Sequence, residues 1–182
     1  MKLRNLIVPA AIAAGSTVSA QDVDNTNKYL GVSAEAGWML NSDKDKTFGL
    51  GGTVSFATPD FIFNSTHNYV TFGAKVFSNP YEGGKFISNV SNGVNDGLNY
   101  LALLAGYRFT ENNFEEGWYV EPRIGFTQAG PYSGFIVAPK GGFMTNKWDF
   151  SLFADAAFGG EESNIGKKNF TSAGLSVGYF FG

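Results

Sequence analysis

Strict alternation of apolar residues with small or polar residues is the feature that most constrains what this chain can fold into. Every even position from 30 to 40 is apolar, and the odd positions between them include Gly31, Ser33 and Glu35. Successive side chains of a β-strand point to opposite faces, so a period of two predicts strands with one apolar and one polar face. Eight segments show this pattern: 28–40, 46–57, 68–78, 98–109, 117–128, 134–144, 147–158 and 169–181.

The number and length of these segments favour a closed barrel that crosses a membrane. Each segment places about five residues on each face, which is what a tilted strand needs to cross hydrocarbon. An even number of antiparallel strands closes with both chain termini at one end. After the N-terminal twenty residues, no run reaches the roughly 18 apolar residues of a membrane helix. The sequence therefore predicts an all-β fold, an eight-stranded antiparallel up-and-down transmembrane barrel over residues 21–182.

The composition of the polar face indicates which face lines the interior. Periodicity alone is equally compatible with a soluble, lipocalin-like carrier, but the exterior of such a barrel would be dense in Lys, Glu and Asp. Here the polar face is mostly Gly, Ser and Thr, and only 16% of the whole chain is charged. Small residues suit the narrow interior of an eight-stranded barrel. We therefore expect Phe72, Ile124 and Leu152 to face lipid and the polar face to line the lumen.

Charged residues on the predicted inner face carry both signs, which predicts a structural ion network. Its members are Glu35, Lys75, Arg108, Glu121, Arg123, Lys140 and Asp155, with Asp149 as a further candidate. Isolated buried charges would cost several kcal/mol each, so these groups must pair with one another. A paired network predicts a plugged polar lumen, since an aqueous channel needs about sixteen strands.

Aromatic residues near the strand ends of the apolar face predict a girdle at the membrane interface. These residues are Trp38, Tyr107, Trp118, Trp148 and Tyr179.

Two prolines lie within the predicted strands. Proline has no N–H and removes a hydrogen bond from a β-ladder. We expect a bulge or an open ladder near Pro122 and Pro139.

The first twenty residues have the pattern of a secretory signal peptide. Lys2 and Arg4 precede an apolar run over 6–14, and small residues follow up to Ala20. The run is too short to span a bilayer as a helix, and cleavage is expected before Gln21. The chain has no Cys, so we expect no lipid-anchored cysteine, disulfide or thiolate metal site.

The connecting segments differ in length between the two ends of the predicted barrel. The outer loops are 41–45, 79–97, 129–133 and 159–168, and the inner turns are 58–67, 110–116 and 145–146. Segment 58–67 is long for a periplasmic turn. Binding residues concentrate on loops held by a rigid frame, so loop 79–97 is the candidate for an unknown surface ligand. That loop would present Tyr81, Lys85, Phe86 and Ile87.

Signals for catalysis or cofactors are weak. His67 is the single histidine and has no local Ser/Asp signature, so we expect no cofactor, no metal and no catalytic residue. The formal net charge of −3 gives no reason to expect nucleic acid. Three alternatives stay open: an outer membrane enzyme acting on lipid A or peptides, a narrow channel, and the soluble carrier.

Several stretches carry a family resemblance. They are GLNYLALLAGYRF, GWYVEPRIGF and the closing GLSVGYFFG. Together with the alternating segments, they resemble the small outer membrane β-barrel family of Gram-negative bacteria, which groups with the barrel domain of outer membrane protein A and with opacity-type and small adhesion barrels.

The resemblance implies a non-enzymatic protein that is integral to the bacterial outer membrane. Its implied partners are outer membrane lipids and the barrel-assembly machinery. The signal that this machinery reads would include Gly174, Val177, Tyr179 and Phe181. The chain departs from that signal by ending in Gly182 and not in an aromatic residue.

Overall fold

The computed structural model describes residues 28–40, 48–63, 65, 67–80, 97–129, 132–158 and 169–182. The predicted signal peptide, loops 41–45 and 159–168, and most of loop 79–97 with Tyr81, Lys85, Phe86 and Ile87 lie outside these residues. No helix within the described ranges is long and apolar enough to cross a bilayer.

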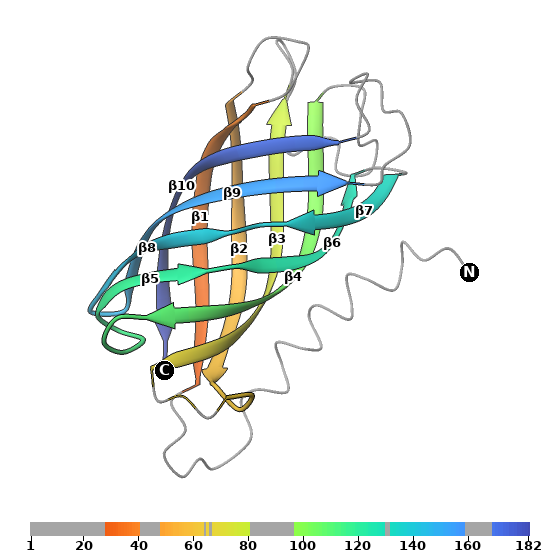
Figure 1. Cartoon of the computed structure of the whole chain (residues 1–182). Coiled ribbons are helices and arrows are strands. Elements are labelled where there is room, and N and C mark those ends of the chain that lie inside the picture. The colour runs from red at the N-terminus through yellow and green to blue at the C-terminus, as the bar shows by residue number, and fades with distance from the viewer. Residues whose placement is uncertain are drawn as a thin grey trace.

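Ten strand segments wrap around a common axis, and the chain ends at the same end as its short turns (Figure 1). The segments are β1 (Tyr29–Met39), β2 (Phe48–Pro59), β3 (Asn68–Pro80), β4 (Gly97–Thr110), β5 (Gly117–Glu121), β6 (Arg123–Ala129), β7 (Tyr132–Val137), β8 (Lys140–Thr145), β9 (Trp148–Phe158) and β10 (Phe170–Phe181).

These ten segments make eight antiparallel strands of a closed barrel. β5 and β6 form one strand interrupted at Pro122, and β7 and β8 form another interrupted at 138–139. Each strand pairs with its sequence neighbour, and β10 pairs with β1 to close the sheet. The predicted fold is confirmed, and the predicted segment ends agree with the observed ones within two residues.

A path along cross-strand partners shows how far the strands are staggered. It starts at Leu30 on β1 and passes Phe56, Phe72, Ala105, Ile124, Val137, Ala156 and Thr171 to Leu40. The path therefore returns ten residues further along the chain than it began. Such a stagger requires strands tilted by about 35–45° to the barrel axis, and eight strands enclose only enough space for side chains.

The two prolines open the ladder without changing its register. Pro122 and Pro139 face each other, because Ile124 pairs with Val137 on one side and Glu121 with Lys140 on the other. The Tyr107 N–H donates to the Pro122 carbonyl over 3.1 Å, and the Ala154 N–H to the Pro139 carbonyl over 3.0 Å. Proline cannot return either bond. The expected open ladder is confirmed, and no bulge accompanies it.

The tightest turn lies one residue later than predicted. β8 continues through Thr145, and the turn consists of Asn146 and Lys147, with φ of 47° and 70°. Two successive positive φ angles define the hairpin turn whose twist matches that of the flanking strands. Asn tolerates positive φ better than most residues, which explains why the turn begins at Asn146.

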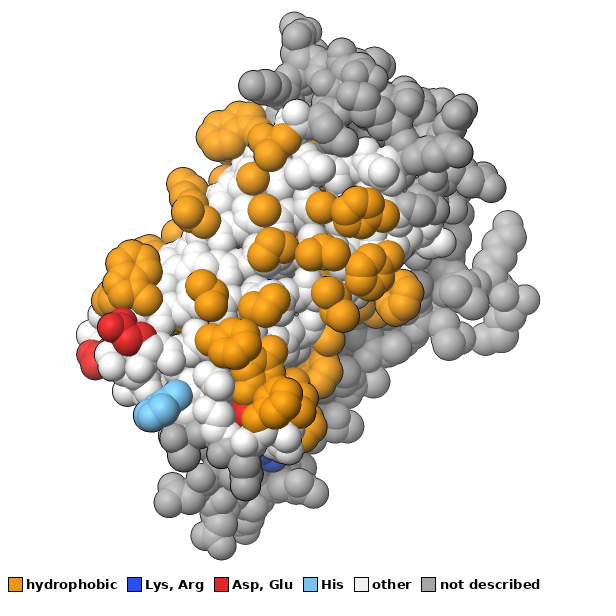
Figure 2. Space-filling model, in the orientation of Figure 1, with side chains coloured by type: hydrophobic (Ala, Val, Ile, Leu, Met, Phe, Trp, Pro, Cys, Tyr) orange, Lys and Arg blue, Asp and Glu red, His pale blue; other side chains and the backbone are white. Residues whose placement is uncertain are grey.

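The barrel wall is apolar on the outside and polar or small on the inside. Phe72, Ile124 and Leu152 are 48%, 54% and 64% exposed, whereas Glu35 and Arg123 are 2% and 5% exposed. On the face shown in Figure 2, hydrophobic side chains are spread over the whole wall, and acidic side chains gather at the turn end. We use "turn end" for the end that carries residues 60–63, 65, 67, 111–116 and 146–147, and "loop end" for the opposite end.

Apolar side chains also fill both ends of the interior. Toward the loop end, Met39, Phe77, Tyr100 and Phe153 belong to one buried cluster. At the turn end, Tyr29, Tyr69, Phe114, Tyr119, Met144 and Phe180 belong to a second. The alternating pattern predicts an inner face of Gly, Ser, Thr and single charges, and these buried aromatic residues were not predicted.

Candidate functional site: the polar network inside the barrel

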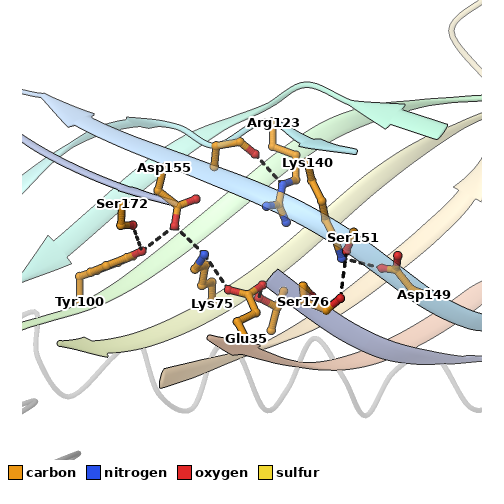
Figure 3. A network of polar contacts seen from close by, with 12 residues as sticks. Glu35, Lys75, Tyr100, Arg123, Lys140, Asp149, Ser151, Asp155, Ser172 and Ser176 are labelled. Atoms are coloured by element: carbon orange, nitrogen blue, oxygen red, sulfur yellow. Dashed lines mark hydrogen bonds and ion pairs between the residues drawn. The ribbon is translucent and has the colours of Figure 1, made fainter. Parts of the chain in front are cut away.

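Eight charged side chains meet between the two apolar clusters, and Figure 3 shows much of this network from close by. Every one of them points inward because it occupies the inner parity of its strand. All are at most 7% exposed: Glu35, Lys75, Arg108, Glu121, Arg123, Lys140, Asp149 and Asp155. The structure thus brings together all the residues of the predicted network, including Asp149.

Lys75 occupies the centre of the first group. Its ammonium Nζ lies 2.6 Å from Glu35 Oε2 and 2.5 Å from Asp155 Oδ2. The Thr53 hydroxyl donates to Glu35 over 2.8 Å, and the Tyr100 hydroxyl donates to Asp155 over 2.5 Å. The two carboxylates therefore share one cation, and neutral hydroxyls supply further donors.

Lys140 and Asp149 form the second group across the β8–β9 hairpin. Lys140 Nζ lies 2.6 Å from Asp149 Oδ2, and the Tyr119 hydroxyl donates to Asp149 Oδ1 over 2.6 Å. Both oxygens of this buried carboxylate therefore have a donor. Because the hairpin turn fixes which residues face each other, this pair depends on the register of the turn.

The third group pairs Arg108 with Glu121. Arg108 Nη2 and Nε both lie 2.6 Å from Glu121 Oε2, and the Thr71 hydroxyl donates to Oε1 over 3.0 Å. The guanidinium carbon also lies 4.0 Å from the centre of the Tyr119 ring and 4.7 Å from that of Phe114. These cation–π contacts join the network to the aromatic cluster at the turn end.

Arg123 differs from the other cations because its bond is to the backbone. Its Nε donates to the Ala138 carbonyl over 2.8 Å. Ala138 precedes Pro139, so this hydrogen bond holds the wall from inside the barrel, next to the position where the ladder is open.

The network is electrically balanced, which suits a structural role. Four cations stand against four carboxylates among the described inward groups. The carboxylates contact Lys, Arg, Thr and Tyr. Within the described part of the chain, no group of three or more His, Asp or Glu side chains could hold a metal ion.

A phenylalanine from a turn closes the interior at the turn end. Phe114, fully buried, stacks on Tyr29 with ring centres 4.1 Å apart and an interplanar angle of 12°. Its ring meets Tyr69 and Phe180 edge to face at 4.8 and 4.9 Å. Segment 111–116 thus inserts its one aromatic side chain into the barrel mouth.

Several residues that contact the network were not predicted from the sequence. Tyr100 and Tyr119 hold the carboxylates of Asp155 and Asp149, and Phe114 covers Arg108. Strand parity could have found the two tyrosines, since both share the inner face with charged residues of their strands. No comparable periodic signal marks Phe114, which lies in a turn.

The residues of the predicted aromatic girdle lie on the outer wall. Trp38, Trp118 and Trp148 are exposed, and Tyr107 and Tyr179 are partly exposed. Ring contacts link these positions to aromatic neighbours: Trp38 to Phe48, Trp118 to Phe143, Trp148 to Tyr179, and Tyr107 to Phe109. The Trp38–Phe48 pair lies toward the loop end, and the other pairs lie toward the turn end.

The residues of the predicted assembly signal lie on β10, the strand that closes the barrel. Val177 and Phe181 are exposed on the outer wall, and Tyr179 is partly exposed between them. Gly174 pairs directly with Gly37 of β1.

His67 lies at the turn end, outside the network. Its ring Nδ1 is 2.8 Å from the Asn112 carbonyl, and its backbone N–H donates to the Ser65 hydroxyl over 3.3 Å. The imidazole is exposed and connects two neighbouring turns. A catalytic Ser-His-Asp arrangement would need a serine hydroxyl bonded to a ring nitrogen, and the described contacts of this ring contain none.

Asp60, which follows β2, organises the turn between β2 and β3. Its carboxylate accepts the backbone N–H groups of Ile62, Phe63 and Ser65 over 2.8 to 3.2 Å. The Tyr107 hydroxyl donates to the same carboxylate over 2.6 Å. Desolvation opposes ionisation of Asp60, but the donors from Tyr107 and the backbone outweigh it and lower its pKa from 3.8 to about 2.

The Asp60 turn is expected to come apart only in strong acid. A lowered pKa means that the ionised carboxylate stabilises the folded turn above about pH 4, and that this contribution is lost as the pH falls toward 2. Amide chemical shifts of Ile62 and Phe63, followed by NMR in micelles, should titrate with a midpoint near 2. A midpoint at the ordinary value of 3.8 would contradict the described hydrogen bonds.

Comparison with solved structures shows a similar barrel in Ail, the attachment invasion locus protein of Yersinia pestis. The structure of Ail in complex with the heparin analogue sucrose octasulfate has a TM-score of 0.53 and 10% sequence identity, covering 87% of this chain and 100% of that chain. A second Ail structure gives a TM-score of 0.53 and 10% identity over 86% of this chain and 100% of Ail. No protein-family model and no curated protein sequence matches the chain. At this identity the likeness establishes the fold.

Proposed function

We propose that this chain is a non-enzymatic, integral protein of the bacterial outer membrane, with a filled lumen and a role at the cell surface that its loops carry out. In this proposal residues 1–20 are the signal peptide and 21–182 the barrel. The barrel-assembly machinery inserts the barrel, and lipids surround it.

The observation that carries the proposal is the inversion of the usual distribution of side chains. Large apolar side chains such as Phe126 and Leu152 are 74% and 64% exposed, whereas Lys75 and Asp155 are fully buried. Soluble monomers rarely expose contiguous apolar patches larger than a few hundred Å². A closed sheet satisfies its backbone hydrogen bonds internally, so its apolar wall can enter hydrocarbon.

The filled lumen is supported by burial at every level of the barrel. Phe114 and Tyr29 close the turn end, the paired charges occupy the middle, and Phe77 and Phe153 pack toward the loop end. Side chains fill the narrow interior of such barrels, whereas porins with an aqueous channel have about twice as many strands. We propose that the network keeps the barrel rigid and closed.

The surface role is supported by the fold and by the name of a protein that shares it. Ail is an attachment invasion locus protein, and one of its structures holds a heparin analogue. Rigid barrels present loops well suited to binding. For this chain we propose a surface ligand of unidentified chemistry that binds at loop 79–97.

Heat-modifiable migration on SDS gels tests the proposal. A closed, hydrogen-bonded barrel extracted from the membrane fraction should migrate differently before and after boiling, because the folded sheet resists SDS until heated. A variant with Gly125→Pro, which should disrupt the wall, provides the unfolded reference. Recovery in the soluble periplasmic fraction, with the same migration before and after boiling, would reject the proposal.

A further inference from the structure

The turn between β2 and β3 exposes three large apolar side chains in succession. Phe61, Ile62 and Phe63 are 68%, 56% and 76% exposed. Their segment lies beyond the last residue of β2, Pro59, and is longer than reversing an antiparallel strand requires. An exposed apolar segment of this kind at a turn calls for a partner that covers it.

Backbone N–H groups of this segment have acceptors within the protein, which favours a poorly hydrated environment. Asp60 accepts the N–H groups of Ile62, Phe63 and Ser65, so these donors do not depend on water. An unsatisfied N–H in an apolar medium costs several kcal/mol, which keeps irregular backbone away from lipid. Here one carboxylate satisfies three of these backbone donors.

The segment folds against the outside of the barrel wall. The Tyr107 hydroxyl donates to Asp60 over 2.6 Å, and the Phe63 ring meets the Tyr107 ring edge to face at 5.8 Å. Val70 is directly across from Tyr107 and has the outward parity of β3, yet it is only 6% exposed. The wall is therefore covered at this point.

The exposed segment continues the apolar exterior of the barrel. Phe63 contacts Tyr107, and Tyr107 in turn contacts Phe109, which is 46% exposed on the outer wall. Along the same end lie the exposed Trp118 and Trp148. Aromatic residues at this position in a membrane barrel sit at the boundary between headgroups and acyl chains.

We propose that Phe61, Ile62 and Phe63 form a membrane anchor that inserts from the turn end into the interfacial layer of the adjacent phospholipid leaflet. This inference rests on the proposed membrane location of the barrel. The occupant is lipid because the segment is continuous with the apolar outer wall and because Asp60 accepts the backbone N–H groups of Ile62 and Phe63. The anchor fixes the depth and tilt of the barrel on this side.

Depth-dependent fluorescence quenching tests the anchor. The chain contains no Cys, so Ile62→Cys can carry a single environment-sensitive fluorophore in the full-length folded barrel. The protein is reconstituted into phosphatidylcholine vesicles that carry a nitroxide either near the headgroup or deep in the acyl chain. We expect the Ile62→Cys label to lose more fluorescence to the shallow nitroxide than to the deep one.

Two matched labels separate the anchor from the membrane location itself. Leu152→Cys, at an exposed position in the middle of the wall, should lose more fluorescence to the deep nitroxide. Glu116→Cys, at an exposed position in the neighbouring turn, should lose little to either. If Leu152→Cys is not quenched, the proposed membrane location fails. If Leu152→Cys is quenched and Ile62→Cys behaves like Glu116→Cys, the anchor alone is overturned, and a protein partner would have to cover the segment.

A second variant tests the role of the carboxylate. Asp60→Ala in the Ile62→Cys protein frees three backbone donors, so the segment should leave the interface and the label should lose its quenching by the shallow nitroxide. Quenching of Leu152→Cys should not change when the same substitution is added. Unchanged quenching of the Ile62→Cys label would overturn the part assigned to Asp60.

Discussion

Lys75→Met should lower the free energy of unfolding by about 3–5 kcal/mol, because it leaves two buried carboxylates facing each other without a cation. Glu35 and Asp155 lie 2.6 and 2.5 Å from the Lys75 ammonium, and none of the three side chains is accessible to solvent. Met has a similar volume, so the lost charge accounts for most of the effect. Urea titration of the protein in phospholipid vesicles measures the change, with the folded fraction read from its migration on SDS gels without boiling.

The same substitution at an exposed ion pair provides the control. Lys147 Nζ lies 3.8 Å from Glu115, and the two side chains are 30% and 42% exposed. Exposed pairs contribute about 0–1 kcal/mol, so Lys147→Met should be nearly neutral. Adding Glu35→Gln and Asp155→Asn to Lys75→Met should restore part of the stability. Equal effects of the two Lys→Met substitutions would contradict the structural role of the network.

Gly125→Ala should be the most damaging of the small substitutions in the wall. A Cβ at Gly125 would lie 1.8 Å from the Leu103 carbonyl oxygen and 2.8 Å from its carbon. These are backbone atoms of the neighbouring strand β4, so no side-chain rotation relieves the contact. Overpacking of this kind costs about 3 kcal/mol. The urea midpoint and the fraction folded on gels should both fall.

Gly141→Ala is the matched control for this substitution. Its Cβ would lie 3.5 Å from the Tyr119 carbonyl oxygen, which is ordinary contact. Replacing Gly by Ala at a compatible position gains about 0.4–1 kcal/mol by restricting the unfolded chain. Gly141→Ala should therefore be neutral or slightly stabilising. A larger loss at Gly141 than at Gly125 would contradict the described strand spacing.

The barrel wall could be predicted from the sequence because side chains of a strand alternate between its two faces with a period of two. Once Leu152 is assigned outward on β9, Asp149 and Asp155 must point inward. In the same way, an outward Phe72 places Lys75 on the inner face of β3. The eight strands and their order followed from this pattern. Charge on the inner face then made pairing a physical requirement.

Features outside the strands could not be predicted in the same way. The position of Phe114 depends on how segment 111–116 folds back into the barrel, and that of Phe63 on hydrogen bonds to Asp60. Turns have no fixed period, so a side chain there can point into the barrel, along the wall or to water. The cation that each carboxylate contacts could not be predicted either, because the stagger between strands cannot be read from one amino-acid sequence.

The meeting of Gly37 with Gly174 bears on how the barrel is completed. A Cβ on either residue would strike the backbone opposite, at 2.4 Å from the Ala173 oxygen and 2.1 Å from the Ala36 oxygen. At this position the first and last strands therefore meet through main-chain atoms alone on the lumen side. Because neither glycine has a side chain, no side-chain conformation has to be restricted when the two strands pair. The barrel can therefore close at this level through main-chain contact alone, with no side chain of either residue to be accommodated in the interior.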